Sequence, residues 1–96
     1  MKFVRNLTIQ LKPAKAQEFN RAISNEVLPL LKQQPGFDHE LTMVRDNHAV
    51  AISIWTDKAS AEKYTATTFP KVLERLTPFI EGNPVVQTYD LTATSL

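Results

Sequence analysis

The segment from residue 48 to 56 constrains the fold more than any other part of the sequence, because both of its faces are apolar. One face carries Val50, Ile52 and Ile54, and the other carries Ala49, Ala51, Ser53 and Trp55. Alternation with a period of two predicts a strand, and apolar residues on both faces are typical of a strand inside a covered sheet. This segment therefore predicts a central strand with a layer of structure on each side.

The periodicity of the rest of the chain predicts two helical regions and three more strands. Apolar residues at three- and four-residue spacing predict the helices, with a kink at Pro29, a break at Phe69-Pro70 and an end of the second region at Gly82. The three further strands are predicted at residues 2–11, 37–45 and 85–92. The resulting order, β-α-β-β-α-β, is the ferredoxin-like α+β arrangement.

The length of the chain limits how this sheet can be covered. Its 96 residues form one small domain, residues 1–96, whose helices can cover only one face of the sheet. Because the central strand is apolar on both faces, another chain must cover the second face. We therefore expect a homodimer.

The composition argues against polyanionic and membrane partners. Eleven Lys and Arg residues against ten Asp and Glu residues leave a net charge of +1, which provides no field to attract nucleic acid. No apolar run approaches the ~18 residues of a membrane span. The absence of cysteine excludes disulfides and favours the reducing cytoplasm.

Cofactor and RNA sites are not indicated either. His39 and His48 lie on different predicted strands, and Gly36 and Gly82 do not form a glycine-rich phosphate loop. The common RNA-recognition module has the same strand order, but it needs exposed aromatic residues beside basic ones, and the central strand offers only Trp55. We expect neither metal, nor nucleotide cofactor, nor RNA.

Five side chains are candidates for a site, and each also has an ordinary structural explanation. Trp55 contacts a ligand or closes the end of the core, and Tyr64 lines a pocket or simply packs inward. His39 is either a general base or a core or interface histidine. Asn6 and Arg5 occupy opposite faces of the first strand, and the sequence leaves open which of them faces the helices.

If both helical regions lie on one face of the sheet, their aromatic residues converge. We expect an apolar pocket bounded by Trp55, Tyr64, Phe69 and the face of the first helix around Phe19 and Ile23. The break in the second helical region provides its mouth, because loops open more easily than packed helices. Such a pocket would hold a small aromatic or hydrophobic molecule.

Several short segments, taken in their order and spacing, carry a resemblance to a known protein family. They are Pro29-Leu30-Leu31, Gln34-Pro35-Gly36-Phe37, Ile54-Trp55, Phe69-Pro70 and Glu81-Gly82. Together they make the chain, from Phe3 to Leu91, resemble the antibiotic biosynthesis monooxygenase-like family of dimeric α+β barrels. The resemblance implies two ferredoxin-like protomers packed sheet against sheet, with their helices outside.

The resemblance also narrows the function. The family includes haem-degrading enzymes, which use a Trp on the second helix and a His beyond it. Here Tyr64 stands in place of the Trp, and no histidine follows His48, so haem degradation is disfavoured. The family's phenol-oxidising enzymes use Asn, Trp, Tyr and Arg side chains, and Asn6, Trp55 and Tyr64 are residues of these types.

We therefore predict a cofactor-independent monooxygenase that oxidises a phenol or quinol with O₂. Without a bound cofactor, the substrate itself must be the electron donor, and a phenol donates electrons better once it is ionised. Asn6 and Tyr64 would stabilise the oxyanion, and His39 would be the base if its face meets the cavity. The alternative is a non-catalytic dimeric binding module for a small hydrophobic metabolite.

Overall fold

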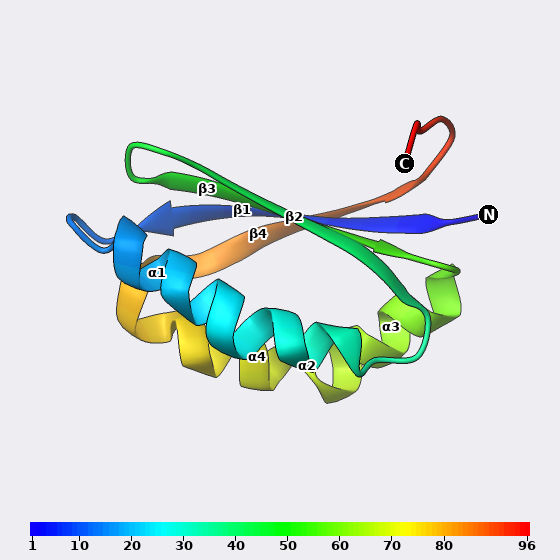
Figure 1. The fold of residues 1–96 in the computed structure, drawn as a ribbon, viewed down its shortest axis with the longest axis horizontal. Coiled ribbons are helices and arrows are strands. Elements are labelled where there is room, and N and C mark those ends of the chain that lie inside the picture. The colour runs from blue at the N-terminus through cyan, green and yellow to red at the C-terminus, as the bar shows by residue number, and fades with distance from the viewer.

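The computed structural model describes residues 1–96 as a four-stranded antiparallel sheet with all its helices on one face (Figure 1). The elements are β1 (Phe3–Leu11), α1 (Ala16–Ala22), a π-helical turn (Ile23–Val27), α2 (Leu28–Lys32), β2 (Phe37–Arg45), β3 (His48–Trp55), α3 (Lys58–Thr67), α4 (Phe69–Leu76), a 3₁₀ turn (Thr77–Phe79) and β4 (Ile80–Asp90). This order confirms the predicted ferredoxin-like fold.

The sheet has the strand order β2-β3-β1-β4, with β3 inside as its two apolar faces predict. The pairing of β1 with β3 sets Arg5 opposite Ser53 and Asn6 opposite Ile52. Phe3 and Leu7 share the buried face with Arg5, so this is the face that packs on the helices. The register therefore turns Arg5 toward the helices and Asn6 away from them.

A β-bulge at Asp38 determines which side chains of β2 face the helices. Phe37 pairs with Trp55 and His39 pairs with Ile54, so two residues of β2 advance while β3 advances by one. Phe37 consequently packs edge-on against Trp55 on the helix side, whereas His39 points to the opposite face. Plain alternation would place Phe37 and His39 on the same face, and the bulge separates them.

The first helical region is interrupted one turn before the predicted kink. In the π-helical turn, the amide of Leu28 donates to the carbonyl of Ile23, five residues back. Pro29, directly after it, has no amide hydrogen to continue the ladder. The interruption therefore takes the form of a widened turn, which places Ile23 and Val27 in the core.

The second helical region is capped at its start, breaks where the sequence predicts and ends earlier than predicted. The Asp57 side chain caps α3 by accepting from the Ser60 amide at 2.8 Å, and Pro70 lies in the first turn of α4. The predicted helix up to Gly82 is wrong: β4 already begins at Ile80, and Gly82 lies within it with a φ of 66°. Its pairing with β1 shifts register between Thr8 and Gln10.

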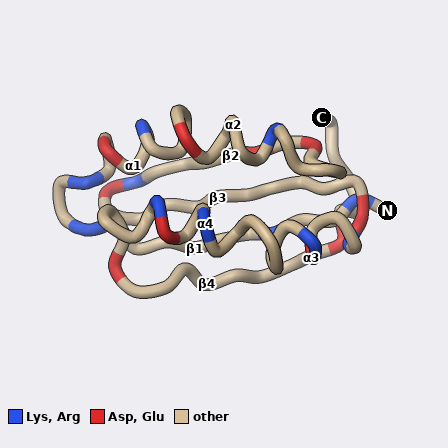
Figure 2. Tube along the Cα trace, turned by 90° about the horizontal axis from the view of Figure 1, so that it is seen from below, with Lys and Arg blue, Asp and Glu red and all other residues tan.

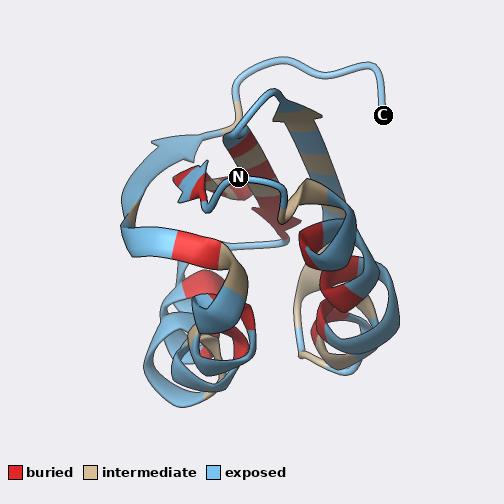
Figure 3. Cartoon of the chain, turned by 90° about the vertical axis from the view of Figure 1, so that its left-hand side faces the viewer, coloured by how far each residue is buried: buried red, intermediate tan, exposed pale blue.

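The core lies between the sheet and the helices, as the buried faces in Figure 3 show. Its most completely buried large side chains are Trp55, Phe19, Ile9, Leu11, Leu31 and Leu76. The other face of the sheet has no covering layer in the single chain, and its exposed apolar side chains are Leu41, Met43, Val85 and Tyr89.

Charged residues of both signs lie close together along α1 and α4 (Figure 2). Across the two helical regions, Arg75 Nη1 pairs with Glu26 Oε1 at 2.8 Å, and Thr68 Oγ1 donates to Gln34 Oε1 at 3.0 Å. None of the helices combines the length and apolarity needed to cross a bilayer.

Candidate functional site

Arg5 is a buried cation without a polar partner. Only 2% of the residue is exposed, and its Nη2 atom has no hydrogen-bond partner. The ion pairs of the protein do not include it. Burial lowers the pKa of Arg5 below its usual range, against the opposing influence of Tyr64 and Glu40. An unpaired buried charge is costly to keep, so its position calls for a functional explanation.

Aromatic rings hold the Arg5 guanidinium in place. Its Cζ atom lies 4.4 Å from the centroid of the Phe69 ring and 5.1 Å from that of Tyr64, within the range of cation–π attraction. Tyr64 in turn packs on Trp55 with ring centroids 4.8 Å apart, and the Trp55 Nε1 donates to Ser53 Oγ at 2.9 Å. The cation therefore sits against a continuous aromatic wall that leaves Nη2 free.

A small cavity of about 30 Å³ lies beside this guanidinium, and we call it the inner cavity. Its polar lining residues are Arg5, Glu40, Ser53 and Tyr64, and the rest of its lining is mostly apolar, Phe69 and Ile23 included. This volume suits one water-sized group. A mostly apolar void with a few convergent polar groups is the usual form of a binding site.

Two ionisable groups other than Arg5 face the inner cavity. Burial raises the pKa of Glu40 to about 7, although a hydrogen bond from Thr42 Oγ1 to Glu40 Oε2 (2.9 Å) and the charge of Arg5 both act to lower it. Burial raises the pKa of Tyr64 to about 12, so its hydroxyl stays protonated at neutral pH and can donate. The cavity thus combines a cation, a hydroxyl donor and a carboxylate that titrates near neutrality.

A wider cleft of about 420 Å³, here called the outer cleft, opens beside β2. Its walls are the first helical region, with Asn20, Ile23, Ser24 and Leu28, and the helix-facing residues Glu40, Thr42 and Val44 of β2. Ile23 and Glu40 line both voids and therefore stand where the two meet. The outer cleft opens at the β2 edge of the sheet, whereas the sequence predicted a mouth at the break before Pro70.

The structure brings together part of the predicted set. Tyr64, Phe69 and Ile23 line the inner cavity. Trp55 supports Tyr64 from behind, and Phe19 is fully buried in the core; neither lines a void.

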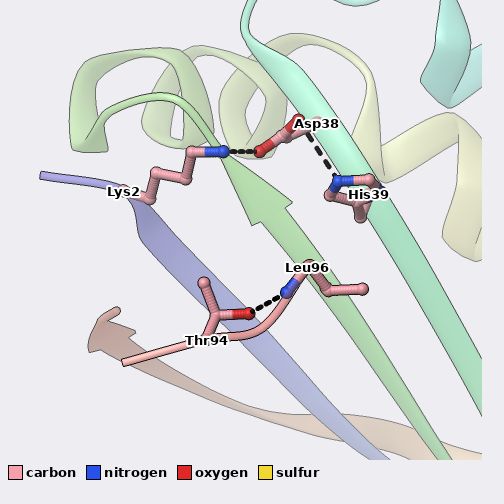
Figure 4. Close-up of polar contacts among 5 residues, drawn as sticks. All are labelled: Lys2, Asp38, His39, Thr94 and Leu96. Carbon is pink, nitrogen blue, oxygen red and sulfur yellow. Dashed lines mark hydrogen bonds and ion pairs between the residues drawn. The ribbon is translucent and has the colours of Figure 1, made fainter. Parts of the chain in front are cut away.

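Asn6 and His39 are not part of this group. Both lie on the sheet face that points away from the helices, so the expectation that they meet Tyr64 in one cavity is corrected. His39 Nε2 instead lies 3.5 Å from Asp38 Oδ1, and Asp38 also pairs with Lys2 (Figure 4).

Sequence reasoning missed Glu40 as a site residue and left open whether Arg5 or Asn6 faces the helices. A signal for Arg5 was present, because Ser53, its partner across the strands, is the one polar residue on its face of β3. In the sequence, Glu40 alternates with Asp38 and Thr42, a polar row that by itself predicts a face toward solvent or an interface. Only the pairing of β2 with β3 shows that this row faces the helices.

No protein-family model and no curated protein sequence matches this chain. Solved structures do match it. SnoaB, a cofactor-independent oxygenase from Streptomyces nogalater, superposes with a TM-score of 0.81 at 19% identity, over 98% of this chain and 96% of SnoaB. The ActVA-Orf6 monooxygenase of Streptomyces coelicolor, solved with nanaomycin D, superposes with a TM-score of 0.80 at 17% identity, over 98% and 90%.

A protein proposed to be an antibiotic biosynthesis monooxygenase, from Caulobacter crescentus CB15, gives a TM-score of 0.79 at 17% identity, over 96% of this chain and 91% of its own. The chain therefore has the protomer fold of the antibiotic biosynthesis monooxygenase structures, which confirms the ferredoxin-like protomer that the sequence resemblance implied.

Proposed function

We propose that this protein is a cofactor-independent monooxygenase that oxidises a phenol or quinol with O₂ beside Arg5. The observation that carries the proposal is the buried Arg5 Nη2 without a partner, on a side chain that lines the inner cavity and packs against the rings of Tyr64 and Phe69. The fold shared with SnoaB and with the nanaomycin-bound monooxygenase supports it.

The free guanidinium donor suits the anionic form of such a substrate. A phenolate oxygen beside Nη2 would receive a charge-assisted hydrogen bond, which is strong in a dry site. The protonated Tyr64 hydroxyl, lining the same cavity, would supply a second donor. Phe69 and Tyr64 exclude water from this oxygen.

The chemistry balances without an outside reductant. For a hydroquinone, the substrate and O₂ give a hydroxyquinone and water: one oxygen atom enters the ring and the other leaves as water. All four electrons that reduce O₂ come from the substrate. The task of the protein is to stabilise the ionised phenol, from which the first electron passes to O₂.

A second copy of the chain would complete the molecule by covering the open sheet face. That face exposes Met43 and Tyr89 by 48% and 52%, and Val50 and Ile52 are only half-buried on it. The doubly apolar β3 is thereby buried on both sides. The catalytic cavity lies on the helix side, so each protomer would carry a site of its own.

Oxygen uptake by the purified, cofactor-free protein tests this function on a panel of hydroquinones and anthrones. Uptake should exceed the autoxidation control, and Arg5→Met should lower it by about 10²–10³-fold, the usual cost of removing an oxyanion donor. Tyr64→Phe should lower it less. Arg45→Met, which alters an exposed residue, serves as the matched control.

Uptake no faster than autoxidation would refute the enzyme. Binding of the same compounds without uptake would leave the non-catalytic binding module. Uptake that survives Arg5→Met would show that the chemistry occurs elsewhere.

A further inference from the structure

We propose that Glu40 accepts the proton of the bound phenol, and that the substrate lies in the outer cleft with only its hydroxyl end in the inner cavity. This inference rests on the proposed function for the class of substrate. It adds a base, a route of entry and an orientation, which the fold alone does not provide.

The sizes of the two voids determine the orientation. The inner cavity, at about 30 Å³, accepts a hydroxyl group but no ring, whereas the outer cleft, at about 420 Å³, is in the usual range for small-molecule sites. Glu40 and Ile23 line both voids, so a hydroxyl that enters the inner cavity from the outer cleft lies next to the Glu40 side chain. The ring then rests in the outer cleft.

Glu40 is held in position to act on that hydroxyl. The Thr42 hydroxyl donates to Oε2 at 2.9 Å, which leaves Oε1 to accept a proton. In the transfer, the phenolic O–H bond breaks, the new O–H bond forms at Oε1, and the electron pair stays on the phenol oxygen. The resulting phenolate lies beside Arg5. Glu40 therefore holds the proton, and Arg5 stabilises the negative charge on the phenol oxygen.

The electrostatics around Glu40 fit this task. The charged or titratable groups that face it are Arg5 from β1 and Tyr64 from α3, while the first helical region presents the uncharged Asn20 and Ser24. Burial brings the pKa of Glu40 to about 7, which is close to the value that an efficient base needs at neutral pH. No other carboxylate lines the inner cavity.

The wall of the outer cleft offers hydrogen bonds to the far end of the substrate. Asn20, Ser24 and Thr42 provide side-chain donors and acceptors beside the apolar Ile23, Leu28 and Val44. The site therefore fits an aromatic ring system with further hydroxyl groups away from the reacting phenol.

A spectroscopic titration tests the proton transfer without relying on oxidation. The probe is 4-hydroxyacetophenone, whose neutral and ionised forms absorb at different wavelengths, added anaerobically near neutral pH where the free probe is mostly neutral. The wild type should bind it as the phenolate. Glu40→Gln should bind it in the neutral form, while Glu74→Gln, which alters an exposed carboxylate on α4, should behave as wild type. Circular dichroism checks that both variants are folded.

The position of the ring is tested by filling the cleft. Asn20 is exposed on α1, so Asn20→Trp should keep the fold and lose probe binding. A bound neutral phenol in the wild type, a bound phenolate in Glu40→Gln, or unchanged binding in Asn20→Trp would each overturn the inference. If the phenolate forms as expected and no substrate consumes O₂, the proposed function fails while the acid–base assignment stands.

Discussion

Replacing Arg5 by methionine should stabilise the protein while it removes the function. Methionine is similar in length to the arginine stem and carries no charge, so it keeps most contacts with the aromatic wall. What it removes is a cation that is 98% buried and whose Nη2 lacks a hydrogen-bond partner. Replacing buried ions by apolar side chains is often neutral or stabilising.

The size of the effect follows from three contributions. An unpaired buried donor costs about 1–3 kcal/mol, and methionine relieves this cost. The two cation–π contacts, to Phe69 and Tyr64, are lost, and together they are worth about 2 kcal/mol in a desolvated site. Sulfur–aromatic contacts of methionine return about 1 kcal/mol. The balance is a gain of about 1 kcal/mol, which raises Tm by roughly 4–8 °C in a domain of this size.

Differential scanning calorimetry at one fixed protein concentration measures the shift, since dimerisation makes Tm depend on concentration. Arg45→Met, at an exposed position, should change the unfolding free energy by less than about 0.5 kcal/mol. A phenol at about 100 times its Kd should stabilise the wild type by roughly 2.7 kcal/mol and the Arg5→Met variant far less. A lower Tm for Arg5→Met would refute the reasoning, because it would mean that Arg5 is kept for stability.

Three further predictions concern the fold, the buried carboxylate and the open face. Gly36→Ala should lower the unfolding free energy by about 2 kcal/mol or more in a urea titration, because Gly36 has a φ of 80° and the new methyl group would collide with Ser60. Gly82→Ala, with a similar φ but open space around it, should cost only about 1 kcal/mol in the same titration. The raised pKa of Glu40 means that the folded protein holds a proton which the unfolded chain releases. The unfolding free energy should therefore fall by up to about 3 kcal/mol as the pH rises from about 5 to 8, and Glu40→Gln should flatten this slope. An equal slope in both proteins would contradict the burial of this carboxylate. Ile52→Glu should yield a monomer by light scattering where the wild type is a dimer, and a monomeric wild type at micromolar concentration would disprove the assembly.

Much of the fold could be predicted because its determinants are local. The doubly apolar β3 and the break before Pro70 are set by neighbouring residues and occur where expected. The start of β4 was missed because Phe79 and Ile80 continue the helical spacing of α4, and an apolar pair at this point serves a helix end and a strand start equally well. The backbone of Ile80 is extended directly after the 3₁₀ turn that contains Pro78, so Ile80 starts β4 instead of continuing the helix.

The site was harder to predict because it breaks the pattern that reveals the core. Arg5 and Glu40 are charged residues at helix-facing positions, and alternation assigns such residues to solvent. Tyr64 and Phe69 were found because aromatic residues follow the ordinary rule for buried faces. Asn6 and His39 were chosen for their chemistry, and strand pairing, which depends on distant residues, places them elsewhere.

The bulge at Asp38 means that strand register, rather than residue identity, selects the acid–base group of the cavity. Without the extra residue in the pairing, His39 would lie opposite Ser53 beside Arg5, and Glu40 would turn to the open face. A slip of one residue would thus exchange a carboxylate for an imidazole with no change of sequence. Since β2 carries apolar residues on both faces, its hydrophobic pattern opposes this slip only weakly. The contact of Phe37 with Trp55 at one end of the strand and the turn at Asp46 at the other fix the register of β2. They therefore keep Glu40, and not His39, beside the cavity.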